Sequence, residues 1–196
     1  MRKRVLLSLI IFIVSIFSLW AQSNNYHDVV TIEPTFSYQH IRYHVPQYNN
    51  KSGLGLGLFV GYDHFEDDYR SSGVQLSFEH FQYPTFYNYT DIKLAGVFKA
   101  RLIPKDDPNT NTRLFFAFGT GADFVFREDG DFGAYMYLSG GLELVFFGDD
   151  RSDITVKADV AGTFQNGSAL IHASVGLGIR LGFGKPIEDS KEEVVR

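Results

Sequence analysis

The chain has 196 residues, a formal net charge of −5 and no cysteine. The absence of cysteine excludes disulfide bonds and thiolate metal sites, and the acidic balance argues against a nucleic-acid-binding protein. The length indicates one folded domain, and the composition is rich in aromatic residues and glycine, with 19 Phe, 11 Tyr and 19 Gly.

The N-terminus has the layout of a secretory signal peptide. Residues 1–4 are M-R-K-R, residues 5–19 are apolar with only serine interruptions, and W-A-Q and polar residues follow. We predict cleavage after Ala21, so that residues 1–21 are the signal peptide. Residues 22–183 then form the folded domain, and residues 184–196 form a charged tail without periodicity.

Segments with strand periodicity follow one another along the rest of the chain. In each, apolar residues alternate with polar or small ones, and the segments are residues 30–40, 53–65, 73–83, 91–102, 113–126, 132–146, 154–164 and 169–183. Connections are short, such as R-E-D-G-D at 127–131 and Asn166-Gly167, so each strand is expected to pair with the next. Pro34 lacks an N–H and is expected at an unpaired position or a bulge. The pattern predicts an all-β, eight-stranded antiparallel up-and-down barrel without helices.

The last segment, residues 169–183, carries the longest alternation. Its apolar face ends on an aromatic residue and includes Val175, Leu177, Ile179, Leu181 and Phe183. Alternation over fifteen residues exceeds the usual length of a strand in a soluble protein. A strand that crosses a membrane at a tilt needs about 9–11 residues of this kind. The segment is therefore interpreted as the closing strand of a transmembrane β-barrel.

The opposite face of the strands carries charged residues among many Gly, Ala and Ser. They are Glu33, Asp63, Glu79, Asp91, Lys93, Lys99, Arg101, Asp123, Glu143, Lys157, Asp159 and Arg180. Glycine suits a narrow lumen better than a solvated face, so this face is predicted to point inward. Isolated buried charge is costly, and these residues are expected to form an internal ion-pair network. Because eight strands leave only enough interior for side chains to fill, a sealed or very narrow lumen is expected. A soluble, lipocalin-like barrel is the alternative.

The chain resembles the small eight-stranded outer-membrane barrels, the OmpA-barrel, OmpX and OmpW-like group. The resemblance rests on the alternating strands and on the terminal V-G-L-G-I-R-L-G-F at residues 175–183. A final strand that ends on an aromatic is similar to the signal read by the barrel-insertion machinery, although thirteen residues follow here. The resemblance implies a location in the outer membrane of a Gram-negative-type envelope. It implies membrane lipid and the insertion machinery as partners, no cofactor, and no shared active site.

Candidate site residues fall into the following groups. His172 and Ser174 resemble the His-x-Ser pair of lipid A deacylases, but they fall on the lumen face and no Glu follows within the barrel. His40, His44 and His80 are expected near one rim, without the spacing of a metal site. Aromatic residues of the first two outer loops are expected to bind partners or to form the upper girdle; they are Tyr43, Tyr48, Phe86, Tyr87 and Tyr89.

The sequence therefore favours a non-enzymatic outer-membrane barrel with a structural role or a narrow, porin-like channel for small solutes. The alternatives are a surface adhesin, which would use the Tyr-rich loops, and a lipid A-modifying enzyme, which would need a complete catalytic constellation.

Overall fold

The structure of the chain, a computed structural model, describes residues 26–42, 51–67, 69–84, 87–102, 112–149, 152–165 and 168–186. The predicted signal peptide and residues 187–196 of the predicted charged tail lie outside these residues, whereas residues 184–186, predicted to belong to the tail, extend the last strand. The described residues form β1 (Tyr26–Arg42), β2 (Lys51–Phe65), β3 (Arg70–Gln82), β4 (Tyr89–Arg101), β5 (Thr112–Arg127), β6 (Phe132–Asp149), β7 (Ser152–Gln165) and β8 (Ser168–Pro186). Over the same residues, no helix is long and apolar enough to cross a membrane.

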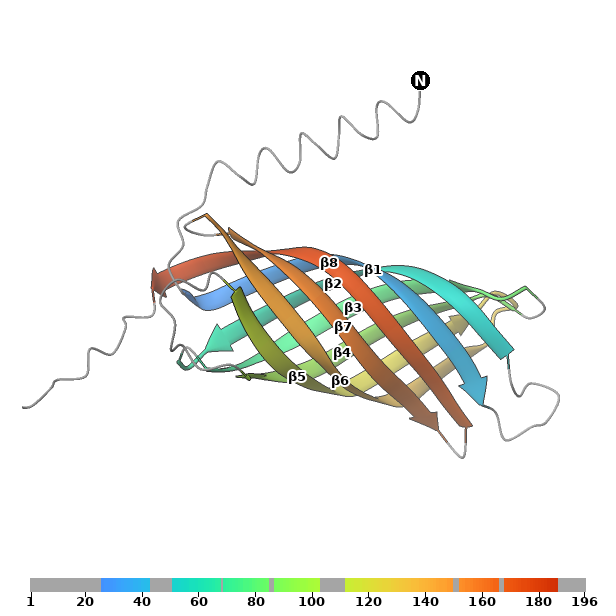
Figure 1. The fold of residues 1–196 in the computed structure, drawn as a ribbon. Coiled ribbons are helices and arrows are strands. Elements are labelled where there is room, and N and C mark those ends of the chain that lie inside the picture. Colours follow the sequence, from blue (N-terminus) through green and yellow to red (C-terminus); the bar gives the residue numbers. More distant parts are fainter. Residues whose placement is uncertain are drawn as a thin grey trace, which may run out of the picture.

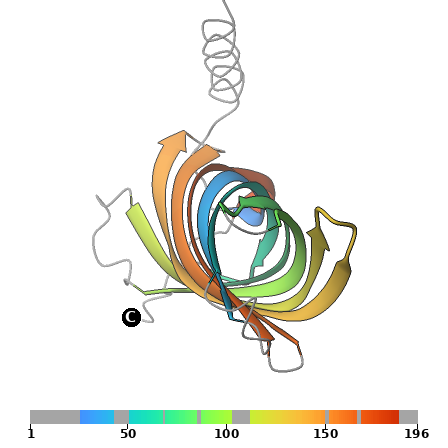
Figure 2. The same ribbon diagram turned by 90° about the vertical axis from the view of Figure 1, so that its right-hand side faces the viewer.

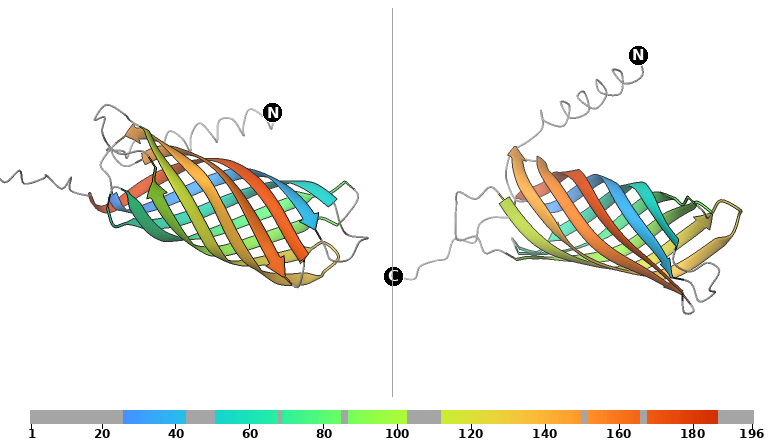
Figure 3. Two further views of the ribbon diagram at one scale, coloured as in Figure 1. Left: turned by 60° about the horizontal axis from the view of Figure 1, so that its bottom comes forward. Right: turned by 45° about the vertical axis from the view of Figure 1, so that its right-hand side comes forward.

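Each strand pairs antiparallel with its neighbour in sequence, and β8 pairs with β1 to close the sheet (Figure 1). Figure 2 shows the strands around a common axis, and the two views of Figure 3 show their tilt to that axis. The predicted eight-stranded, up-and-down barrel is thereby confirmed. Closure leaves no free sheet edge along the body of the barrel.

The ladder between β1 and β8 has two irregularities. Pairing stops after Ile32↔Ile179 and resumes at Thr35↔Gly176 in the same register. Pro34, which has no N–H to donate, therefore sits at a break in the ladder and not at a bulge. The register shifts instead between Tyr26 and Asp28.

The two faces of the strands differ as the alternation predicts. Large apolar side chains cover the outer surface, and the exposed fraction reaches 68% at Leu56 and 62% at Leu177. Charged side chains point inward, where Lys93 is only 1% exposed. This is the reverse of a soluble barrel, in which the apolar face fills the interior.

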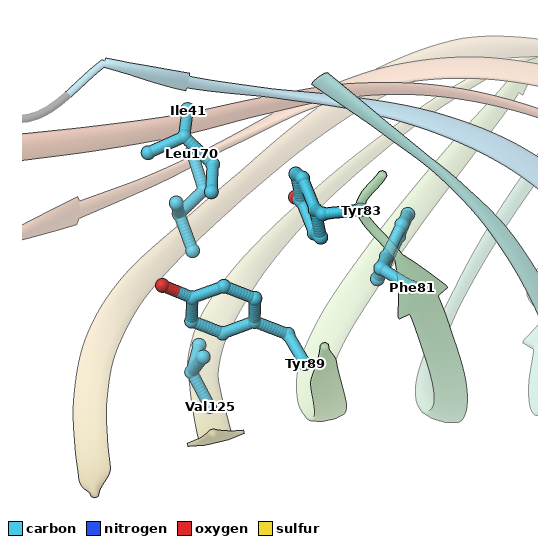
Figure 4. Packing of buried hydrophobic residues seen from close by; sticks show 6 residues of the cluster. All are labelled: Ile41, Phe81, Tyr83, Tyr89, Val125 and Leu170. Atoms are coloured by element: carbon cyan, nitrogen blue, oxygen red, sulfur yellow. The ribbon is translucent and has the colours of Figure 1, made fainter. Parts of the chain in front are cut away.

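Apolar side chains occupy the lumen near both ends of the barrel. We call the end where β1 begins and β8 ends the proximal end, and the opposite end the distal end. The proximal cluster contains Val29, Phe65, Phe115 and Val145. The distal cluster contains Ile41, Phe81, Tyr83, Tyr89, Val125 and Leu170, whose side chains converge in Figure 4. The charged residues of the lumen lie mostly between these clusters.

Candidate functional site: the charged lumen

Ion pairs in the proximal half of the lumen centre on Lys99 of β4. Its Nζ lies 2.7 Å from Asp63 Oδ2 of β2 and 2.6 Å from Glu143 Oε2 of β6. Arg180 of β8 approaches the same Glu143, with 3.7 Å between Nε and Oε1. The Arg180 guanidinium also lies over the rings of Phe65 and Phe115, at 5.3 and 5.7 Å from their centroids. These ion pairs therefore pack directly onto the proximal cluster.

Lys93 is the corresponding cation in the distal half. It forms an ion pair with Glu79, and its Nζ lies 3.8 Å from Asp91 Oδ2. Ser37 donates to Glu79, and Gln39 Nε2 donates to Asp91 Oδ2 at 2.9 Å. The Lys93 ammonium lies 5.6 Å from the ring centroid of Phe81, a member of the distal cluster. The ion pairs of Lys93 thus contact the distal cluster, as those of Lys99 and Arg180 contact the proximal one.

A third group lies between these two. Lys157 Nζ is 3.1 Å from Asp159 Oδ2 and 4.3 Å from the centroid of the Phe59 ring. A cavity of about 20 Å³ beside it is lined by Glu33, Lys157 and Asp159 among others. That volume has room for about one water molecule. Buried side chains, among them Glu33 and Lys157, border this space.

The structure places all twelve predicted residues on the inner face, but it does not join all of them into ion pairs. Asp123 accepts a hydrogen bond from Thr163 at 2.7 Å, and Glu33 borders the small cavity. Arg101 lies near the proximal rim, with its guanidinium 5.9 Å from the ring centroid of Tyr69. None of these three has an ion-pair partner among the described residues. The expected ion-pair network therefore does not include Glu33, Arg101 or Asp123.

His172 and Ser174 are enclosed in the lumen. The His172 ring stacks on Tyr137 with centroids 6.3 Å apart, and its Nδ1 is buried without a hydrogen bond to a described residue. Ser174 donates its hydroxyl to Asp159. Both side chains point into the interior of the barrel, away from the outer surface, where lipid would lie.

The histidines expected at the distal rim have separate partners. His40 Nδ1 lies 3.0 Å from Ser52 Oγ, and His80 Nδ1 lies 3.0 Å from Thr90 Oγ1. His44 lies outside the described residues. Within the described part of the chain, no group of three His, Asp or Glu side chains is arranged to hold a metal ion.

The aromatic loop residues also divide. Tyr43, Tyr48 and Phe86 lie outside the described residues. The prediction that Tyr89 lies in a surface loop is wrong. Tyr89 is only 2% exposed and belongs to the distal cluster, because it is the first residue of β4 and its side chain points into the barrel. Tyr87 is exposed, and the Arg127 guanidinium lies 4.9 Å from its ring centroid.

The distal turn between β5 and β6 is held by its own charges. Arg127 Nε lies 2.5 Å from Asp129 Oδ1, and Arg127 also pairs with Asp131. Hydrogen bonds from this guanidinium lower the pKa of Asp129, so its carboxylate keeps its charge to a lower pH than an isolated aspartate would. The turn is thus a local ion-paired structure.

A cluster of polar side chains at the proximal rim is not predicted by the sequence pattern. His64 Nδ1 lies 2.9 Å from Asp28 Oδ1, Tyr62 donates to the same oxygen at 2.6 Å, and the His27 ring stacks on His64. His27 and Asp28 lie at the register shift of β1. A bulge re-aims side chains, whereas strict alternation would place these two residues on opposite faces.

Comparisons with known proteins identify the fold. No protein-family profile and no curated protein sequence matches the chain. Among solved structures, Neisserial surface protein A (NspA) has a TM-score of 0.58 at 7% identity, over 80% of this chain and 97% of that one. Ail of Yersinia pestis, solved in complex with a heparin analogue, has a TM-score of 0.46 at 14% identity, over 79% and 99% of the two chains. The N-terminal β-barrel of Pseudomonas aeruginosa OprF has a TM-score of 0.41 at 14% identity, over 81% and 99%. The likeness to NspA shows that the chain shares the fold of a small eight-stranded barrel.

Proposed function

We propose that the chain is an integral outer-membrane β-barrel protein with a structural, non-catalytic role and a lumen closed to solutes. The observation that carries the proposal is the filled lumen. Apolar clusters occupy both ends, and buried ion pairs occupy the space between them. A channel needs a continuous polar path for the solute. The apolar clusters interrupt such a path at both ends, and buried pairs such as Lys93–Glu79 occupy the space between them.

The membrane location rests on the outer surface. Exposed leucine, valine and phenylalanine side chains surround the barrel, and water would be a poor solvent for so large an apolar surface. A signal peptide and a closing strand whose outward apolar alternation ends on Phe183 would deliver such a chain to the insertion machinery of the outer membrane. The proximal end then faces the periplasm, since β1 begins and β8 ends there.

The absence of catalysis is inferred from the enclosure of the candidate pair. His172 and Ser174 lie in a lumen whose nearest cavity is about 20 Å³, too small for a lipid substrate.

Conductance tests the proposal. The refolded chain from Gln22 onward is inserted into a planar bilayer, and insertion is verified by the heat-dependent gel shift of a folded barrel. A folded, inserted protein without discrete current steps is expected. Regular openings of uniform size would contradict the closed lumen and favour the narrow-channel alternative. Failure of the gel shift in lipid would contradict the membrane barrel itself.

A further inference from the structure

A groove opens on the outside of the barrel near its distal end, where β2 and β3 separate. Their pairing ends at Leu54↔Gln82, while β2 continues to Lys51 in pairing with β1 only. The space between the two strand ends measures about 440 Å³, within the range of small-molecule sites.

Apolar side chains form the floor and one wall. Leu54 faces outward and is 54% exposed, and the Tyr38 ring stands beside it on β1. Tyr38 donates its hydroxyl to Ser52 Oγ at 2.8 Å, which fixes the position of this wall. The floor continues toward the proximal end in Leu56 and Leu58, on the outward face of the same strand. The groove is therefore continuous with the surface assigned above to lipid.

Close approach of the backbone shapes the rear of the groove. A Cβ on Gly53 would lie 2.8 Å from the Gln82 carbonyl oxygen and 2.9 Å from the Tyr83 ring. Glycine at this position lets the chain after β3 approach β2 closely. Tyr83 is anchored from the other side by its hydroxyl, which donates to Gln39 in the lumen.

The polar groups of the groove are uncharged. They are the Ser52 hydroxyl and the side-chain amides of Gln82 and Asn88, and none of the described residues that line the groove carries a charge. Asn88 is held in place, since its Oδ1 accepts the N–H of Tyr83 at 3.3 Å. The Gln82 side chain is exposed and has no hydrogen-bond partner among the described residues. Amides and hydroxyls pair with hydroxyl groups, and tyrosine rings cover the apolar faces of sugar rings.

The geometry points to a binding site for a membrane lipid with an uncharged, hydroxyl-rich sugar headgroup. The headgroup lies between Ser52, Gln82 and Asn88, and one acyl chain follows Leu54 and Leu56 along the outside of β2. The inference rests on the proposed location in the membrane, because only there does the leucine floor meet acyl chains. A charged headgroup would find no opposite charge among the described residues that line the groove.

Lipid retention tests the site. The protein is reconstituted into nanodiscs of phosphatidylethanolamine and phosphatidylglycerol that contain a minor fraction of monoglucosyl diacylglycerol. Native mass spectrometry then counts the lipids that stay bound on release. Enrichment of the glucosyl lipid over its share in the nanodisc is expected. Gln82→Leu removes one headgroup partner, and Leu54→Trp fills the floor.

Each variant is expected to lower the retained glucosyl lipid about three- to tenfold, the equivalent of one neutral hydrogen bond or one lost apolar contact. Thr120→Val is the matched control, because Thr120 is exposed on the outward face of β5, away from the groove, and retention should not change. Equal retention of all lipids by the wild type, or equal retention by the variants, would overturn the site. Binding of a second copy of the chain at this surface in place of lipid would overturn it as well.

The gel shift of each sample separates the two proposals. A barrel that folds in the nanodisc but shows no lipid preference contradicts the groove alone. A chain that does not fold in lipid contradicts the membrane location, and the lipid site with it.

Discussion

At the scale of the residue, Lys99 is the most exacting position of the lumen. Its ammonium lies within 2.7 Å of two buried carboxylates, those of Asp63 and Glu143. Lys99→Met would leave Asp63 without its cation and Glu143 with only the distant Arg180. We expect a loss of about 3–5 kcal/mol in the free energy of unfolding, because one partner of a buried pair is left uncompensated.

Urea-induced unfolding in lipid vesicles, followed by the gel shift, measures this loss. Lys51→Met at the distal rim is the control, and it should stay within about 0.5 kcal/mol of wild type. Similar values for the two variants would mean that the Lys99 pairs contribute no more than rim charges.

The same residues show what a sequence alone reveals about the site. Alternation is sufficient to assign Lys99, Asp63 and Glu143 to the inner face. It does not reveal that Lys99 of β4 reaches β2 on one side and β6 on the other, since those contacts depend on how far the strands are staggered around the barrel. Glu33 and Arg101 fall on the predicted face but miss the ion pairs for this reason.

At the scale of the element, glycines on the two faces of neighbouring strands have opposite roles. A Cβ on Gly121 of β5 would lie 2.6 Å from the Ala95 Cα and would contact the Leu94 carbonyl oxygen. A Cβ on Gly96 of β4 would point outward, with its nearest heavy atoms 4.0 Å away. We expect Gly121→Ala to destabilise the barrel by about 1–3 kcal/mol through overpacking against backbone.

Gly96→Ala is the paired control. It is expected to be neutral or to stabilise by up to about 0.5–1 kcal/mol, since alanine loses less backbone freedom than glycine on folding. Equilibrium unfolding of both variants in the same lipid measures the difference. Equal effects would show that the narrow approach at Gly121 relaxes without cost.

The period of two in the sequence predicts the order of the strands and which side chains point inward. It does not predict the positions where the pairing departs from that period. Pro34 is recognisable in advance because its missing N–H must interrupt a ladder, and the break between Ile32 and Thr35 occurs there. The register shift between Tyr26 and Asp28 has no comparable marker. The aromatic and histidine contacts of His27 with His64 are therefore visible only in the fold.

At the scale of the whole molecule, the inverted distribution of apolar and charged residues makes the surroundings of the barrel testable. Leu94 lies midway along β4 and is 53% exposed on the outer surface, whereas Leu102 lies just beyond the proximal end of the same strand. In a lipid bilayer, Leu94→Arg should lower the free energy of unfolding by about 2–4 kcal/mol, and Leu102→Arg by about 0–1 kcal/mol. The depth of each position in the hydrocarbon is the cause of the difference. Unfolding in vesicles measures both. In a barrel surrounded by water, an arginine at either exposed position would be tolerated alike, so equal and small effects would contradict the membrane location.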